Sequence, residues 1–285
     1  MTIHERAALV ASRLEHTGLP ARDAIFDTTI LMRHALGWDR ARWILGQHDA
    51  EPPGFEQAIE RLVSRRVERE PVAYILGARE FWSLDLEVTP DVLIPRPETE
   101  FLVEEALARL PRPAPGLTPR VIDVGTGSGC VAVSLAHDRA DIRVTATDIS
   151  PAALAVAARN ARRHGVEDRI RFEVRDLLEG VIDVPDVIVS NPPYVARRDG
   201  PGLSREVGGH EPHVALFGGD ADGRGTIRRL LAQSAALLAP GGWLLFEFGY
   251  GQEIDGLVAA HPTLKLDDIR EDLQGIPRTA IVRRV

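Results

Sequence analysis

Residues 121–130 read VIDVGTGSGC, an apolar run followed by three glycines in five positions. The run at 121–124 is typical of a buried strand. Glycines directly after it let the backbone turn sharply into a helix and approach a ligand closely. Cys130 stands where a dinucleotide fingerprint has its third glycine, which argues against NAD. We therefore expect a strand, loop and helix whose loop contacts another cofactor through Gly125, Thr126, Gly127, Ser128 and Gly129.

Beyond residue 119, apolar strand-like runs alternate with helical patterns. We expect strands at 121–124, 143–147, 170–174, 186–190, 243–248, 263–269 and 278–284, and helices at 129–137, 151–164, 224–238 and 252–260. Continuous apolar strands separated by helices indicate an α/β fold with a parallel sheet that is covered on both faces.

The chain before this region has a different character. Residues 3–76 repeat apolar side chains at three- and four-residue spacing, which predicts a small bundle of about four helices. Residues 77–95 favour short β structure, a helix follows to about Leu110, and the Pro-rich stretch 111–118 is typical of a linker. We therefore expect three parts: a helical bundle at 1–76, a hairpin-like segment with a connecting helix at 77–110, and the α/β domain at 111–285.

Composition excludes several classes of protein. The 285 residues carry 34 basic and 42 acidic side chains, a net charge of −8, which argues against a protein that coats nucleic acid through a basic face. One cysteine excludes an intramolecular disulfide, and the nine histidines show no metal-binding spacing. No apolar run approaches the ~20 residues of a membrane span. We expect a cytoplasmic protein without a metal or a membrane contact.

Acidic residues follow two further strands. Asp148 ends the second strand, 19 residues after Gly129, where a carboxylate can accept hydrogen bonds from both hydroxyls of a ribose. Asp176 follows the third strand, where it can contact an adenine amino group, with Leu177 against the ring. These residues extend the expected cofactor site.

The strand at 186–190 runs directly into Asn191-Pro192-Pro193-Tyr194. The two prolines fix the backbone and remove two N–H donors, so this loop presents carbonyl oxygens and the Asn191 side chain beside an aromatic ring. Such a loop suits a planar NH₂ group: Asn191 and the Pro192 carbonyl accept its hydrogens while Tyr194 packs on its plane. An amide and the N6 group of adenine fit equally well, so the loop alone does not choose between them.

Together, the glycine loop, Asp148 and Asn191–Tyr194 resemble S-adenosylmethionine-dependent amino methyltransferases of the Rossmann-like class. Further motifs narrow the likeness to the release-factor glutamine methyltransferase family (PrmC/HemK). They are Phe81-Trp82, LIPRPETE at 93–100, Glu211-Pro212, ALFGG at 215–219 with Asp222-Gly223, FEFG at 246–249 with Gln252, and DLQGIPR at 272–278. By motif, the resemblance covers roughly residues 70–285.

The resemblance implies an enzyme that methylates the side-chain amide nitrogen (N5) of the glutamine in the Gly-Gly-Gln motif of peptide chain release factors. S-adenosylmethionine is the implied cofactor and S-adenosylhomocysteine the product. The implied sheet has seven mostly parallel strands with an antiparallel last strand, and the bundle helps to dock the release factor. Asn191, Pro192, Pro193 and Tyr194 would bind the substrate, with Asn191, Pro192 and Tyr194 acting in catalysis. Asn191 would also border the cofactor.

Two other functions fit part of the pattern. One is a methyltransferase acting on adenine N6 in nucleic acid, and the other is a non-enzymatic module that binds S-adenosylmethionine and translation factors. The acidic chain and the lack of an inserted target-recognition domain argue against DNA, so we expect no stable binding of nucleic acid. Glu247, at the end of the strand 243–248, is a weaker candidate for the substrate region.

Overall fold

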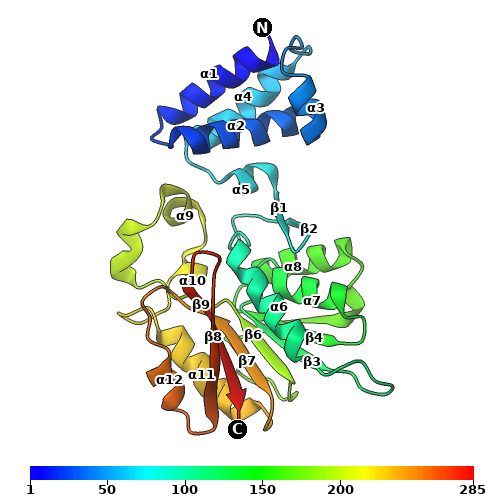
Figure 1. Ribbon diagram of the computed structural model, residues 1–285, viewed down its shortest axis with the longest axis vertical. Coiled ribbons are helices and arrows are strands. Elements are labelled where there is room, and N and C mark those ends of the chain that lie inside the picture. Colours follow the sequence, from blue (N-terminus) through cyan, green and yellow to red (C-terminus); the bar gives the residue numbers. More distant parts are fainter. The chain divides into compact units, whose positions relative to one another are not determined.

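The computed structural model describes residues 1–285, and the chain divides into two compact units. The helical unit comprises Met1–Gly77 together with Ser204–His210, and the sheet unit comprises Ala78–Leu203 with Glu211–Val285. Figure 1 labels the elements of both. No helix is both long and apolar enough to cross a membrane.

The helical unit is built from amphipathic helices around a single apolar core. Its N-terminal elements are α1 (Ile3–Glu15), α2 (Ala21–Leu36), α3 (Arg40–Leu45), α4 (Phe55–Val67) and α5 (Val72–Leu76). Thr2 and Glu5 form a reciprocal capping box at the start of α1, and Gly37 ends α2 in the left-handed conformation that glycine adopts without strain. Leu14, Leu31, Phe55 and Ile59 are among the buried side chains of this core.

The sheet unit contains the expected seven-stranded sheet. Its strands are β3 (Arg120–Val124), β4 (Arg143–Asp148), β5 (Ile170–Val174), β6 (Val187–Ser190), β7 (Trp243–Glu247), β8 (Leu264–Glu271) and β9 (Pro277–Arg284). They lie in the order β5-β4-β3-β6-β7-β9-β8. The first five are parallel, and β9 pairs antiparallel with both β7 and β8. The Rossmann-like fold predicted from the sequence is therefore confirmed.

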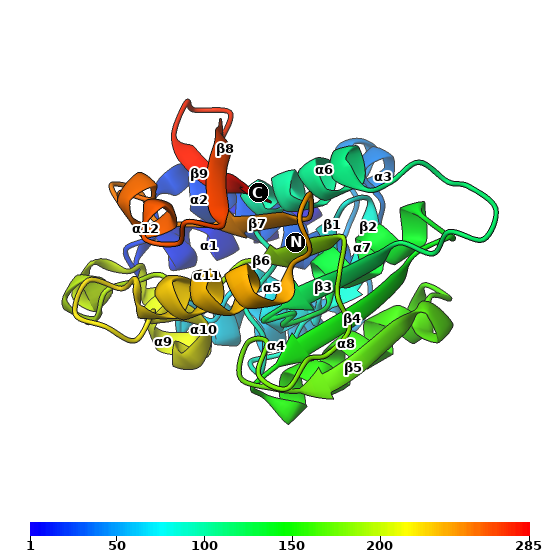
Figure 2. The ribbon, with the colours of Figure 1, turned by 90° about the horizontal axis from the view of Figure 1, so that it is seen from below.

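Both faces of this sheet are covered. Val121, Val187 and Val189 point into one core, while the alternate residues Ile122 and Ile188 point into the other. The first core includes residues of α6 (Glu100–Arg109), α7 (Cys130–Asp138) and α8 (Pro151–Arg163). The second includes residues of α11 (Gly225–Leu237) and α12 (Asp255–Ala259). In Figure 2, α6 and α11 lie on opposite sides of β6 and β7. Burial on both faces explains why the central strands β3, β6 and β7 are mainly apolar. The edge strands β5 and β8 also carry charged residues.

Residues 77–110 form no separate part, which corrects the expected division. The hairpin of β1 (Ala78–Phe81) and β2 (Leu84–Glu87) turns through Trp82 and Ser83, and the short helix η1 (Pro97–Thr99) leads into α6. Phe81, Leu86 and Leu102 are buried in the same core as β3 and α7. The prolines in this stretch interrupt its periodicity and so conceal its contribution to the larger core.

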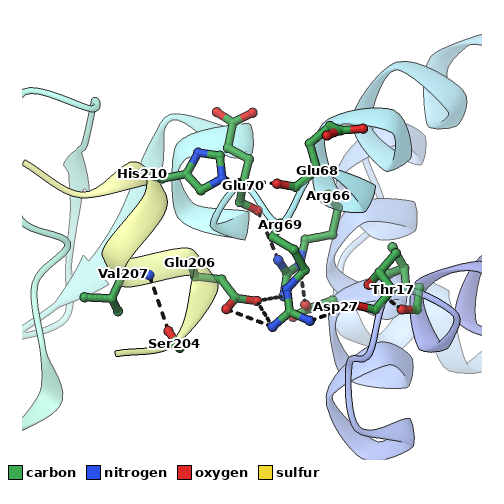
Figure 3. Close-up of polar contacts among 11 residues, drawn as sticks. Thr17, Asp27, Arg66, Glu68, Arg69, Glu70, Ser204, Glu206, Val207 and His210 are labelled. Carbon is green, nitrogen blue, oxygen red and sulfur yellow. Dashed lines mark hydrogen bonds and ion pairs between the residues drawn. The ribbon is translucent and has the colours of Figure 1, made fainter. Parts of the chain in front are cut away.

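The segment Ser204–His210 was not expected in the helical unit. It contains α9 (Arg205–His210) and follows η3 (Arg197–Gly202), and the chain re-enters the sheet unit before α10 (His213–Leu216). Arg66 donates one hydrogen bond to Asp27 at 2.7 Å and another to Glu206 at 2.9 Å, while Arg69 also binds Glu206 (Figure 3). The Arg66 side chain is 5% exposed, so these partners neutralise a buried charge.

Candidate functional site

One cavity of about 270 Å³ lies in the sheet unit at the carboxyl ends of parallel strands. The residues that follow β3, β4, β5 and β6 all contribute to it, as expected for ligand sites in doubly wound sheets. Of the residues proposed from the sequence, its lining includes Gly125, Thr126, Gly127, Ser128, Asp148, Asp176, Leu177, Asn191 and Pro193. Gly129, Pro192 and Tyr194 are outside this lining.

The glycine loop is fixed by its own backbone and by a buried acid. The N–H groups of Gly125 and Thr126 both donate to the Thr147 carbonyl, at 2.8 and 2.9 Å. The Thr126 hydroxyl donates to Asp123 at 2.6 Å, and the Ala132 N–H donates to the same oxygen at 3.1 Å. Burial raises the pKa of Asp123 to about 6. Asp123 was not among the residues expected at the site, although an acid in an otherwise apolar strand is a signal for such a role.

Asp148 borders the cavity with both carboxylate oxygens fixed by backbone donors. One oxygen accepts from Gly127 N and the other from Ser150 N, each at 2.9 Å. Burial raises its pKa above the ordinary value. Each carboxylate oxygen has two lone pairs, so both oxygens can accept a further hydrogen bond from a ligand.

Asp176 and Leu177 line the cavity beyond β5. Asp176 is paired with Arg229 of α11 at 2.7 Å, a partner that its sequence position did not indicate. Leu177 has a φ of 56°, which is unusual for a residue with a branched side chain, and its side chain packs partly against the core that includes α11. Asp176 and Leu177 therefore form one side of the cavity, and Arg229 already neutralises the charge of Asp176.

Gly129 is required for packing. It has a φ of +80°, and a Cβ at this position would lie 2.9 Å from the Cβ of Ala157 on α8. At Gly125, by contrast, an added Cβ would meet nothing within 4 Å. The first glycine leaves room for a ligand, whereas the last lets α7 and α8 approach each other.

The loop Asn191–Tyr194 is held at both ends. Before it, the Ser190 hydroxyl donates to the Val124 carbonyl at 2.8 Å, which ties β6 to β3. The Asn191 Nδ2 donates to the Thr99 hydroxyl at 3.1 Å, and Gln252 Nε2 donates to the Tyr194 carbonyl at 3.0 Å. The Tyr194 side chain packs against the core, and burial raises its pKa to about 12, so it stays protonated.

Two glycines hold the chain that follows this loop. A Cβ on Gly223 would lie 2.4 Å from the Tyr194 carbonyl oxygen, and one on Gly218 would lie 2.8 Å from that of Pro193. Both contacts are with backbone atoms that cannot move aside. Side chains at either position would therefore displace the loop.

The remaining wall comes from residues 91–99. Arg96 donates to Glu211 at 2.5 Å, and the second Glu211 oxygen accepts from Ile94 N at 3.2 Å. The Glu211 side chain is 1% exposed. This buried ion pair ties the wall to the chain after α9, and the role of Glu211 was not identified from the sequence.

The lining residues fit an adenosine-containing cofactor. Asp148 is a half-buried carboxylate with free lone pairs for ribose hydroxyls, and the space above Gly125 and Gly127 admits close approach of a ligand. Apolar side chains that suit a flat ring, among them Leu93, Ile149, Leu177 and Phe217, supply much of the remaining surface. The structure shows no cluster of residues suited to a metal ion.

Comparison with known proteins identifies two matching families along the chain. Residues 8–77 match the PrmC N-terminal domain, and residues 99–203 match the methyltransferase small domain. A protein of Rhodospirillum rubrum named release factor glutamine methyltransferase is 41% identical, over 98% of this chain and 87% of its own length. A protein of the same name from Bordetella pertussis is 43% identical, over 95% of this chain and 97% of its own.

Two solved structures share the fold. A methyltransferase from Pyrococcus furiosus has a TM-score of 0.51 at 18% identity, covering 81% of this chain and 98% of its own. A 16S rRNA N2 G1207 methyltransferase of T. thermophilus, solved with AdoMet and guanosine, has a TM-score of 0.51 at 17% identity. It covers 73% of this chain and 50% of its own. At these identities the likeness concerns the fold alone.

Proposed function

The chain belongs to the release factor glutamine methyltransferase family, and from that premise we propose what its cavity does. It transfers a methyl group from S-adenosylmethionine to the side-chain amide nitrogen (N5) of glutamine in release factors, leaving S-adenosylhomocysteine. Within the release factor, the target is the glutamine of the Gly-Gly-Gln motif. The observation that carries this proposal is that Asn191 borders the same cavity as Asp148 and the loop Gly125–Ser128.

The cofactor site uses residues that are already fixed. Asp148 accepts hydrogen bonds from the ribose hydroxyls, and Gly125–Ser128 let the backbone lie close to the ligand. Leu177 packs on the adenine ring. The Asp176 oxygen that does not contact Arg229 accepts a hydrogen bond from the adenine amino group. The cofactor supplies a methyl group that its sulfonium has already activated.

The substrate site must orient a weak nucleophile. The amide nitrogen shares its lone pair with its carbonyl, so its geometry and charge must be controlled. Asn191 Oδ1 and the Pro192 carbonyl each accept one N–H, which orients the nitrogen and stabilises the positive charge that develops on it. Correct orientation has a ceiling of roughly 7–11 kcal/mol. The nitrogen–methyl bond forms as the sulfur–methyl bond breaks, and the extra proton then leaves to solvent.

The helical unit is the part that we expect to dock the release factor. It exposes large apolar side chains that its own core does not use, including Ile25, Phe26, Ile44 and Leu45. Exposed apolar side chains of this size favour a protein partner over a nucleic acid. The substrate belongs to the translation apparatus, so we place the reaction in the cytoplasm.

The decisive experiment uses purified chain, labelled cofactor, and either a release factor or DNA. We expect label in the release factor only, with mass spectrometry placing the methyl group on the glutamine of Gly-Gly-Gln. Asn191→Ala should abolish turnover while leaving much of the cofactor affinity, measured by calorimetry. Label in DNA but not in the release factor would overturn the proposed function, and near-normal turnover by Asn191→Ala would overturn the role of that residue.

A further inference from the structure

Glu247 is a buried carboxyl group that the methyl transfer described above does not use. It ends β7, is 4% exposed, and its Oε1 atom has no hydrogen-bond partner. Arg96 and Arg278 interact electrostatically with Glu247. However, Arg96 is already paired with Glu211, and Arg278 is already paired with Asp272. A buried acid without an ion pair of its own is costly to stability and needs an explanation.

The position of Glu247 connects it to the substrate loop. Ser190 and Phe246 are register partners on the parallel strands β6 and β7, so Asn191 and Glu247 are the next residues along each strand. Thr99, which is 2% exposed, contacts both. Its hydroxyl accepts from Asn191 Nδ2 at 3.1 Å, and the same side chain lowers the pKa of the Glu247 carboxyl group by hydrogen bonding.

A hydroxyl group alone cannot decide which way an asparagine amide points, because it can donate to the amide oxygen or accept from the amide nitrogen. A carboxylate removes this ambiguity, because it only accepts. When Glu247 takes the Thr99 hydrogen, the Thr99 oxygen can only accept, and Asn191 must turn its NH₂ group toward Thr99. The Asn191 oxygen is then directed away from Thr99.

On the basis of the function proposed above, we propose that Glu247 and Thr99 are positioning residues that hold the Asn191 amide with its oxygen toward the substrate nitrogen. The reversed amide would present its own NH₂ group to the substrate NH₂. Two donors would then face each other, and the charge that develops on the nitrogen would lose an acceptor.

The orientation should depend on the ionisation of Glu247. Burial raises its pKa to about 7, the Thr99 hydrogen bond lowers it, Glu98 raises it, and Arg278 and Arg96 lower it. Tyr194 and Cys130 also interact electrostatically with Glu247. Their pKa values are raised to about 12, so both stay protonated near neutrality. Below about pH 7 the protonated Glu247 can donate to Thr99, which frees the Thr99 hydrogen for the Asn191 oxygen. The fraction of correctly oriented Asn191 therefore rises with pH through about 7.

The test measures methylation of a full-length release factor at saturating S-adenosylmethionine between pH 5.5 and 9. Thr99→Val removes the hydroxyl while keeping the shape, and we expect kcat to fall about 10- to 100-fold, with cofactor affinity by calorimetry within about twofold of wild type. Thr99→Ser keeps the hydroxyl and should restore most of kcat. Glu247→Gln should be most impaired at pH 9 and approach wild type at pH 5.5.

The outcomes separate this inference from the proposed function. An inactive wild-type chain would contradict the proposed function itself. An active wild type with near-normal kcat in Thr99→Val would overturn the inference, as would equal loss in Thr99→Val and Thr99→Ser. A Glu247→Gln profile that stays parallel to wild type at every pH would also overturn it. Asp123, which has a pKa of about 6, is hydrogen-bonded to the glycine loop and not to Asn191. Any change of activity with pH that is due to Asp123 should therefore persist in Glu247→Gln.

Discussion

Replacing Gly129 with alanine tests the packing of α7 against α8. Gly129 has a φ of +80°, a conformation that costs a residue with a Cβ about 1–2 kcal/mol. The new Cβ would also lie 2.9 Å from Ala157 Cβ and 3.2 Å from Ala157 Cα. Ala157 is fully buried, so the clash cannot be relieved by a side-chain rotation, and overpacking of this kind costs about 1–3 kcal/mol. The total expected loss is about 2–5 kcal/mol.

The chain offers a matched control at Gly165. This glycine also has a positive φ, +65°, but a Cβ there would meet nothing within 4 Å. Gly165→Ala should therefore lose only the conformational part, about 1–2 kcal/mol. Urea denaturation of both full-length variants, followed by circular dichroism, gives the comparison.

A double variant checks the identity of the clash. In the Gly129→Ala background, Ala157→Gly removes the atom at 2.9 Å, although glycine inside a helix costs about 1 kcal/mol. The two substitutions should therefore be less damaging together than the sum of their separate effects. Equal losses of stability in Gly129→Ala and Gly165→Ala, or simple additivity in the double variant, would show that Gly129 is not required for the packing of α7 against α8.

Three further predictions concern charged residues. Asp148→Asn should weaken S-adenosylmethionine binding about tenfold in calorimetry, since it replaces a charged acceptor; unchanged affinity would remove Asp148 from the site. Arg66→Met leaves the buried Asp27 without its arginine and Glu206 with Arg69 alone, and should cost about 3–5 kcal/mol in urea denaturation. Arg13→Met, which breaks an exposed pair, should cost less than about 1 kcal/mol. Burial opposes ionisation of Glu206, but hydrogen bonds from Arg69, from its own backbone and from Arg66 lower its pKa from 4.5 to about 2. Its stabilisation is therefore complete above pH 4.5 and lost as the pH falls toward 2, so Glu206→Gln should flatten this part of the stability–pH curve, and a parallel curve would contradict the assignment.

Local pattern was enough to predict the sheet and to place most of the candidate site residues at one edge of it. Apart from Asp123, the strand 121–124 is apolar on both faces, and its neighbour β6 is largely apolar as well. That property is visible in each strand separately. The carboxyl ends of parallel strands meet at one edge, which brings Gly125, Asp148 and Asn191 to one cavity although they are far apart in sequence.

Side-chain contacts between residues far apart in the sequence could not be predicted, because no local pattern indicates them. Thr99 is 92 residues from Asn191, and Arg229 is 53 residues from Asp176. Glu206 lies in a Gly-rich stretch without periodicity, 140 residues from Arg66. Such pairs are determined by side-chain geometry after folding, and one sequence without its relatives contains no signal for them.

The return of Ser204–His210 to the helical unit limits how freely this protein can be recombined. A chimera that exchanges only residues 1–77 with a relative would set the foreign α4 against the native Glu206 and His210, which bind Arg66, Arg69 and the Glu68 carbonyl. The transferable module is therefore discontinuous, and a graft needs both stretches. Because of the same connectivity, deletion of the first 77 residues leaves Ser204–His210 in the remaining chain without the rest of its unit.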